Sequence, residues 1–241
     1  MANEHYKDLT TMRLLVRDQL DEMSASFWTD AQIDRYINRG KDRVWNRLKA
    51  VNEYYCTVTR TSLDGALTIQ GESYTASAFQ IVSGTSDYTL PPDFDQMSMI
   101  EVITSGREDI TFTRMDINDP EFRALRQLTE SQDPFDEVFF DIIGEPAKMR
   151  IAPTVNTTLD LRITYVQSLA DLSAATDRLM LPNPLYQAVT DYAVSFALRQ
   201  DRSPDALTYE QSGDKLIAER FGSDLRQTQD VQTARGYMDG W

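Results

Sequence analysis

Residues 28–51 read WTDAQIDRYINRGKDRVWNRLKAV, and this stretch predicts a long helix with a well-marked start. Thr29 suits the N-cap, and Gln32 three residues later completes a capping box, in which each side chain bonds the other residue's backbone. Trp28 before the cap and Ile33 at the fourth helical position can form a hydrophobic staple. Gly40 allows a partner to approach closely, and further apolar residues mark a buried stripe at helical spacing: Ile37, Val44, Leu48 and Val51.

Further helices are predicted towards both ends of the chain. Apolar residues recur at steps of three and four from Leu9 to Met23, which is one face of a helix. In the C-terminal part, Pro184 is expected at the first position of one helix, and Ser203-Pro204 is expected to open another that ends near Phe221. Each of these helices has a single apolar stripe that needs a partner.

The middle of the chain changes to the patterns of β-strands. Tyr55–Thr59 is rich in β-branched and aromatic residues, and Asp64-Gly65 is a strong hairpin signal before the strand-like run at Leu67. Alternation through residues 158–166 places four residues on one face: Leu159, Leu161, Ile163 and Tyr165. Other runs lie at Phe79–Ser83, Met97–Thr104, Ile110–Met115 and on both sides of Gly144-Glu145-Pro146. We expect about seven or eight strands and one short helix, from Asp119-Pro120 to about Leu128.

These patterns indicate an α+β fold with a β-domain inserted into a helical bundle. The N- and C-terminal helices form a four-helix bundle, because their stripes are hidden only if all four meet. The expected parts are N-terminal helices in residues 1–52, an antiparallel β-domain of sandwich or barrel type in 53–168, C-terminal helices in 169–222 and an extended tail in 223–241. The tail cannot bury enough surface to fold alone, so it is either disordered or docked on another molecule.

Acidity is the first clue to function. The chain has 24 Lys and Arg against 38 Asp and Glu, a formal net charge of −14, and should repel polyanions. Two interpretations stay open: the charge keeps the protein soluble, or it lines a passage through which nucleic acid slides without adhering. No apolar run approaches the roughly 20 residues of a membrane span, and residues 1–8 lack the apolar core of a signal peptide, so we expect no membrane association.

Residue types that carry catalysis or bind metal are scarce. The single histidine, His5, lies in a polar N-terminal segment, and the single cysteine, Cys56, lies in a predicted strand, where a small buried hydrophobe is the simpler role. No P-loop, G-x-G-x-x-G or G-x-S-x-G motif occurs. Choosing one of the many carboxylate pairs as a glycosidase pair is arbitrary without a measured separation. We therefore expect no enzyme activity, no cofactor and no metal site.

Two surfaces are candidates for contact with partners. Arg35, Arg39 and Arg43 share one face of the 28–51 helix through their four-residue steps. This face is an ordinary solvated surface, a set of ion pairs to an acidic neighbouring subunit, or a contact with DNA. Net charge favours the subunit over DNA, because an acidic protein that meets copies of itself needs some basic surface. The late apolar residues of the tail are typical interface anchors, unless the terminus is frayed: Tyr237, Met238 and Trp241.

The segment Trp28–Ile33 with Tyr36-Ile37-Asn38 resembles the N-terminal signature of head-to-tail adaptor proteins of tailed bacteriophages. Further segments are similar to the same family in the same order: Tyr88–Phe94 followed by Ile100–Val102, Gly144–Pro153 followed by Leu159–Tyr165, and Leu181-Pro182 with Leu185-Tyr186 and Tyr192–Val194. Each motif alone recurs in many proteins, and their joint order carries the resemblance. The similarity covers residues 9–221, whereas 223–241 match no motif of the family.

The resemblance implies a structural ring subunit, with twelve copies bound under the portal protein and above the tail or nozzle protein. The helices would form the wall of a DNA channel, the tail would reach the portal, and genomic DNA would pass without specific binding. The protein would be made in the host cytoplasm and reside in the virion neck, the head–tail junction. Alternatives from other classes stay open: another neck or tail completion protein, a carbohydrate- or peptide-binding β module, or an enzyme acting on the cell wall.

Overall fold

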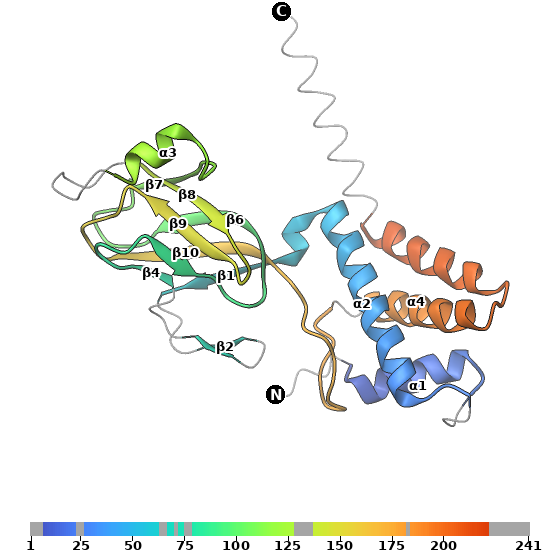
Figure 1. Cartoon of the computed structure of the whole chain (residues 1–241). Helices are drawn as coiled ribbons and strands as arrows, with labels where there is room; N and C mark the ends of the chain where they lie inside the picture. Colours follow the sequence, from blue (N-terminus) through green and yellow to red (C-terminus); the bar gives the residue numbers. More distant parts are fainter. Residues whose placement is uncertain are drawn as a thin grey trace, which may run out of the picture. The chain divides into compact units, whose positions relative to one another are not determined.

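A computed structural model describes residues 7–22, 27–62, 67–69, 72–74, 79–127, 137–181 and 184–221. The chain divides into two compact units (Figure 1). One unit, here called the helical unit, joins Met1–Cys56 with Leu169–Trp241, and the other, the β unit, is the continuous segment Thr57–Ser168. The two ends of the chain therefore build one unit together.

The helical unit contains four longer helices among its described residues. They are α1 (Leu9–Gln19), α2 (Asp30–Val51), α4 (Leu185–Gln200) and a final helix over residues 206–221, with a short 3-10 helix, η1 (Glu53–Cys56), after α2. The predicted capping box is confirmed, since the Thr29 hydroxyl accepts from the Gln32 N–H and the Gln32 side chain accepts from the Thr29 N–H. Pro184 stands at the N-cap of α4 and not at its first helical position.

The N- and C-terminal helices pack together, as predicted, and the closest approach is between α2 and α4. A Cβ atom placed on Gly40 of α2 would lie 2.7 Å from the carbonyl oxygen of Val189 on α4. Gly213 of the final helix makes a similar contact, because its Cβ position lies 3.1 Å from the nearest ring carbon of Tyr192. Gly40 lets α2 and α4, which come from opposite ends of the chain, approach without a side chain between them, and Gly213 leaves room for the Tyr192 ring against the final helix.

A polar clamp on α2 holds the connector of residues 169–172, which leads into the second half of the helical unit. Lys41 is 1% exposed, and its ammonium group donates to the carbonyls of Leu169 and Ala170 at 3.2 and 2.8 Å and to the Asp171 carboxylate at 3.0 Å. The Asn38 side chain exchanges two hydrogen bonds with the backbone of Leu172. The buried charge of Lys41 is thus compensated by three oxygen acceptors.

The β unit contains two four-stranded sheets and a two-stranded one. In the first, β1 (Thr57–Thr61) and β6 (Phe94–Val102) flank β10 (Leu159–Gln167), which also pairs with β4 (Gln80–Ile81). The second has the order β5 (Asp87–Thr89), β9 (Lys148–Ala152), β8 (Glu137–Ile143), β7 (Thr111–Arg114), and β2 (Leu67–Ile69) pairs with β3 (Glu72–Tyr74). The predicted alternation along β10 is confirmed: its buried face contributes Leu159, Leu161, Ile163 and Tyr165 to the core of the unit.

Four predictions for the β unit were wrong, among them the number of strands, which was expected to be about seven or eight. Its strands are not all antiparallel, because β7 runs parallel to β8, and a parallel pair needs a crossover such as the one carrying α3 (Pro120–Leu125). β1 pairs with β10 and not with β2, whereas Asp64-Gly65 lies outside the described residues. Tyr55 and Cys56 belong to η1, not to a strand, although Cys56 is buried as expected. The described residues contain ten strands. Met23 and Leu128, the expected ends of two helices, lie outside them.

The carboxyl group of Asp93 is buried in the β unit beside its core. The Tyr165 hydroxyl donates to the Asp93 carboxylate at 2.8 Å, and an Arg60 nitrogen lies 4.0 Å from the same carboxylate. Burial raises the pKa of Asp93 above its ordinary value of 3.8, although the bond from Tyr165 and the charge of Arg60 act in the opposite direction. Burial likewise raises the pKa of Tyr165.

The close contact at Gly40 predicts the effect of a single methyl group. Gly40→Ala should lower the free energy of unfolding by about 1–3 kcal/mol, because the methyl group meets backbone and overpacks the contact. The higher helix propensity of alanine offsets up to about 1 kcal/mol of this cost. Urea unfolding of the full chain measures the change, with Asn46→Ala, at an exposed position of α2, as the matched control. Equal effects of the two substitutions would contradict a tight α2–α4 contact.

The raised pKa of Asp93 predicts a pH dependence. The folded β unit keeps the Asp93 proton to higher pH than the unfolded chain does, so this residue's contribution to stability should fall as pH rises from about 3.8 through the folded-state pKa. Asp93→Asn removes the titration while its amide oxygen can still accept from Tyr165. The difference in unfolding free energy between wild type and this variant should therefore change with pH, and a difference that stays constant with pH would contradict this prediction.

Candidate interaction surface on the helical unit

Across residues 7–221 with their gaps, no group of three or more His, Cys, Asp and Glu side chains could hold a metal ion. Cys56 is buried, and His5 lies outside the described residues. None of the helices that the structure describes has the length and apolar character needed to cross a membrane. Charged and aromatic side chains do gather on α2, α4 and the final helix.

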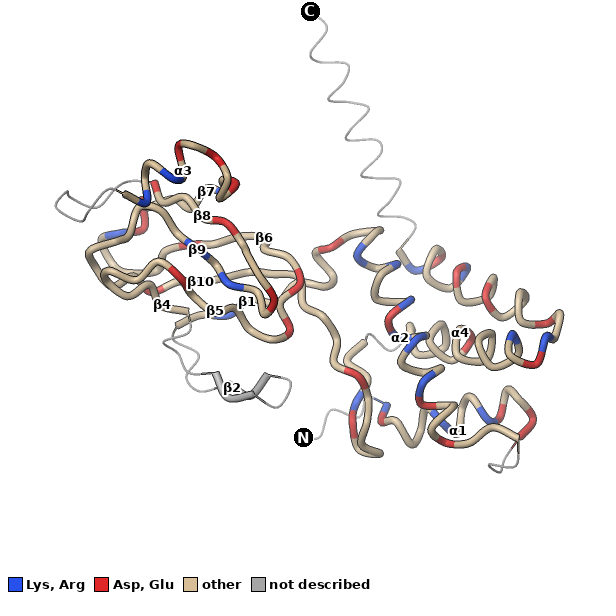
Figure 2. The backbone as a smooth tube through the Cα atoms, in the orientation of Figure 1, with Lys and Arg blue, Asp and Glu red and all other residues tan. Residues whose placement is uncertain are grey.

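The predicted arginines lie along one side of α2, where basic residues recur in Figure 2. The Arg39 guanidinium lies over the Phe196 ring of α4, 4.4 Å from the ring centroid. The Arg43 guanidinium lies over the Tyr192 ring at 4.8 Å. Cation–π contacts of this kind hold long arginine side chains in place while their N–H groups can still donate. α4 thus supplies the aromatic rings against which these arginine side chains of α2 pack.

Two carboxylates of the final helix pair with arginines of α2 and α4. Glu210 accepts a hydrogen bond from Arg43 and forms an ion pair with Arg199, and Glu210 is only 14% exposed. A guanidinium nitrogen of Arg47 lies 3.3 Å from a carboxylate oxygen of Asp214. The same oxygen accepts a hydrogen bond from the Tyr192 hydroxyl at 2.5 Å. Burial and this bond raise the pKa of Tyr192 to about 12. The final helix is therefore fastened to α2 and α4 by charge as well as by the Gly213 contact.

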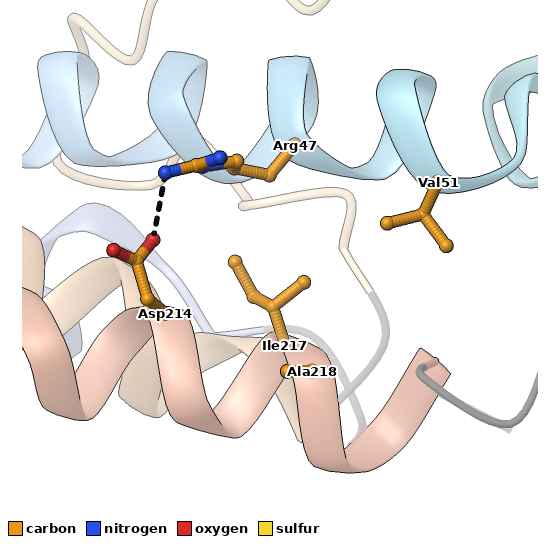
Figure 3. Close-up of a pocket in the computed structure, with 5 residues that line it drawn as sticks. All are labelled: Arg47, Val51, Asp214, Ile217 and Ala218. Atoms are coloured by element: carbon orange, nitrogen blue, oxygen red, sulfur yellow. Dashed lines mark ion pairs between the residues drawn. The ribbon is translucent and has the colours of Figure 1, made fainter. Parts of the chain in front are cut away.

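Two grooves open beside these ion pairs. The first has a volume of about 310 Å³, and Figure 3 shows Arg47 pairing with Asp214 beside its apolar lining residues: Val51, Ile217 and Ala218. The second, here called the arginine groove, is more open, with a volume of about 600 Å³. Its lining combines basic, small and aromatic side chains with one carboxylate: Arg39, Asp42, Arg43, Asn46, Arg47, Ala50 and Phe196. Such a lining suits an acidic partner with an apolar residue.

The structure brings the predicted arginines of α2 next to side chains of α4 and the final helix. Arg39 and Arg43 contact α4 and the final helix of their own chain, and their pairing with a neighbouring subunit stays a prediction, as it does for Arg35. The sequence analysis did not identify Glu210 and Asp214, although their four-residue spacing matches that of Arg39, Arg43 and Arg47. The predicted tail anchors lie outside the described residues: Tyr237, Met238 and Trp241.

A family model described as SU10 adaptor protein matches residues 7–238. No curated protein matches the chain. The matched range contains both halves of the helical unit, the whole β unit and the arginine groove.

The ion pairs of Glu210 predict how firmly the final helix is held. Glu210→Gln should lower the free energy of unfolding by about 1–3 kcal/mol, because it leaves Arg43 and Arg199 without their counter-charge. Glu219→Gln on the same helix is the matched control, since its pair with Lys215 is exposed and should be worth less than about 1 kcal/mol. Amide hydrogen exchange over residues 206–221 reports the effect, and equal protection in the two variants would contradict it.

Proposed function

Because the chain belongs to the SU10 adaptor protein family, we propose that it is a structural head-to-tail adaptor of a tailed bacteriophage. In this proposal, copies of the chain form a ring below the portal and join the portal to the tail. The observation that carries the proposal is the extent of the family match, which spans residues 7–238 and so includes both units. The role is one of assembly, without a chemical reaction.

The partners in this proposal follow the order of a phage neck. The ring contains twelve copies, with the portal protein above it and a tail or nozzle protein below it. The protein is made in the host cytoplasm and resides in the virion neck. The tail residues Tyr237, Met238 and Trp241 contact the portal, because aromatic and methionine side chains are frequent interface anchors.

Charge supports the proposed passage of DNA through the ring. Proteins that grip DNA neutralise phosphates with Lys and Arg and gain affinity from the counterions that are released. This chain has a net charge of −14, so a channel built from it offers few such contacts. The genome would then slide through without being retained. The arginine groove is a local basic surface on this acidic chain, and the net charge favours an acidic protein partner over DNA there.

Reconstitution with the cognate portal protein tests the proposal. Purified chain should be a monomer or weak oligomer alone and should form a ring of uniform copy number on one end of the portal, as seen by electron microscopy. Tyr237→Ala combined with Trp241→Ala should keep the fold but weaken docking, because two large apolar anchors are removed. A chain that stays monomeric and ignores the portal would refute the proposal. Binding to cell-wall fragments in its place would favour a carbohydrate-binding module.

A further inference from the structure

Opposite sides of α2 differ in their contacts. On one side α2 holds α1, because Arg13 forms a bidentate ion pair with Asp34 at 2.5 and 2.6 Å, and Arg17 donates to Asp30 at 2.7 Å. Arg43 follows Asp34 by about two and a half helical turns, which places it on the opposite side of α2. The α1 helix and the arginine groove therefore lie on opposite sides of α2. Figure 1 also shows α4 between α1 and the final helix.

The arginine side of α2 has positive charge that the chain does not neutralise. In the described part of the chain, neither Arg35 nor Arg39 forms an ion pair, and both are exposed. Arg39 is held over Phe196, and Arg47 is 54% exposed despite its contact with Asp214. Unpaired cations on a chain with a net charge of −14 are well placed to receive an acidic partner.

The outer side of α1 has the complementary character. Leu14 is 53% exposed, and Asp18 follows it by four residues, so the two share one face of the helix. Asp21 follows directly after the C-cap residue Leu20, in a left-handed backbone conformation with φ of 53°. Both carboxylates are exposed, and within the described residues neither forms an ion pair. We call Leu14, Asp18 and Asp21 the acidic face of α1.

The position of these carboxylates is unfavourable for the isolated chain. The carbonyl groups at the end of α1 give that end a partial negative charge, which repels Asp18 in the last turn and Asp21 just beyond it. A cation from another molecule would remove this repulsion. Leu14 is likewise unfavourable in water but would be buried by a partner that offers an apolar surface. The acidic face thus lacks what the arginine groove provides, namely guanidinium groups beside Ala50 and Phe196.

We propose that the acidic face of α1 in one copy of the chain docks in the arginine groove of the next copy. Leu14 packs against Ala50 and Phe196, and Asp18 and Asp21 meet the row from Arg35 to Arg47. Because the two surfaces are different and lie on opposite sides of α2, the contact is head-to-tail. A growing row of copies therefore keeps a free acidic face at one end and a free arginine groove at the other. A contact of this kind closes into a ring when its rotation is suitable. The inference rests on the proposed function and names the contact that builds the ring.

Charge exchange across the contact tests this inference. The basic-side variant is Arg35→Glu with Arg39→Glu, which leaves the ion pairs of Arg43 and Arg47 intact. The acidic-side variant is Asp18→Arg with Asp21→Asn, because asparagine tolerates the left-handed conformation at position 21. Arg123→Glu with Arg126→Glu, at exposed positions in and just after α3, changes net charge as the basic-side variant does and serves as the control. Circular dichroism verifies that each variant folds.

Ring yield on the portal, counted by electron microscopy, is the readout. Each one-sided variant should reduce the yield at least about tenfold, because its two surfaces repel each other. A chain with both changes should recover most of the yield, and so should an equal mixture of the two variants, because the copies can alternate around a ring of even number. The control should assemble like wild type. If the one-sided variants assemble normally, or the combined chain is not rescued, the inference is wrong while the adaptor role stands. If wild type forms no ring, the proposed function fails, and the inference fails with it.

Discussion

The close contact of α2 with α4 is the constraint on which the helical unit depends. At Gly40 the two backbones approach so closely that the carbonyl of Val189 occupies the space of a missing side chain. Because α2 precedes the β unit and α4 follows it, this contact closes a long loop that contains the whole of Thr57–Ser168. Closing so long a loop costs conformational entropy, but the cost grows only slowly with loop length, so an inserted unit is tolerated.

The polar contacts of the helical unit act around this α2–α4 contact. Lys41 holds the returning connector through the carbonyls of Leu169 and Ala170, and Glu210 holds the final helix through Arg43 and Arg199. A buried ion pair adds little net stability when its geometry is poor, but removing one partner is costly. These contacts therefore restrict where each segment can pack and complement the apolar stripes, which provide most of the burial.

An acidic chain that assembles with copies of itself has to overcome its own charge. The net charge of −14 keeps copies apart at a distance and discourages DNA from adhering. In the proposed contact, the unpaired arginines of α2 and the acidic face of α1 would offset that repulsion at one defined place. The adaptor family and the arrangement of charge on α2 thus agree in favouring an assembly role.

Local features of this protein were determined by the sequence alone, because they depend on residues a few positions apart. The capping box of Thr29 and Gln32, the alternation along β10 and the cap at Asp119 are of this kind. The direction of β7, the pairing of β1 with β10 and the meeting of Glu210 with Arg43 were decided only by the tertiary structure. Each of these features joins segments that are far apart in the chain. A local sequence pattern indicates that a strand or a charged side chain needs a partner, but it does not indicate which distant segment will pack beside it.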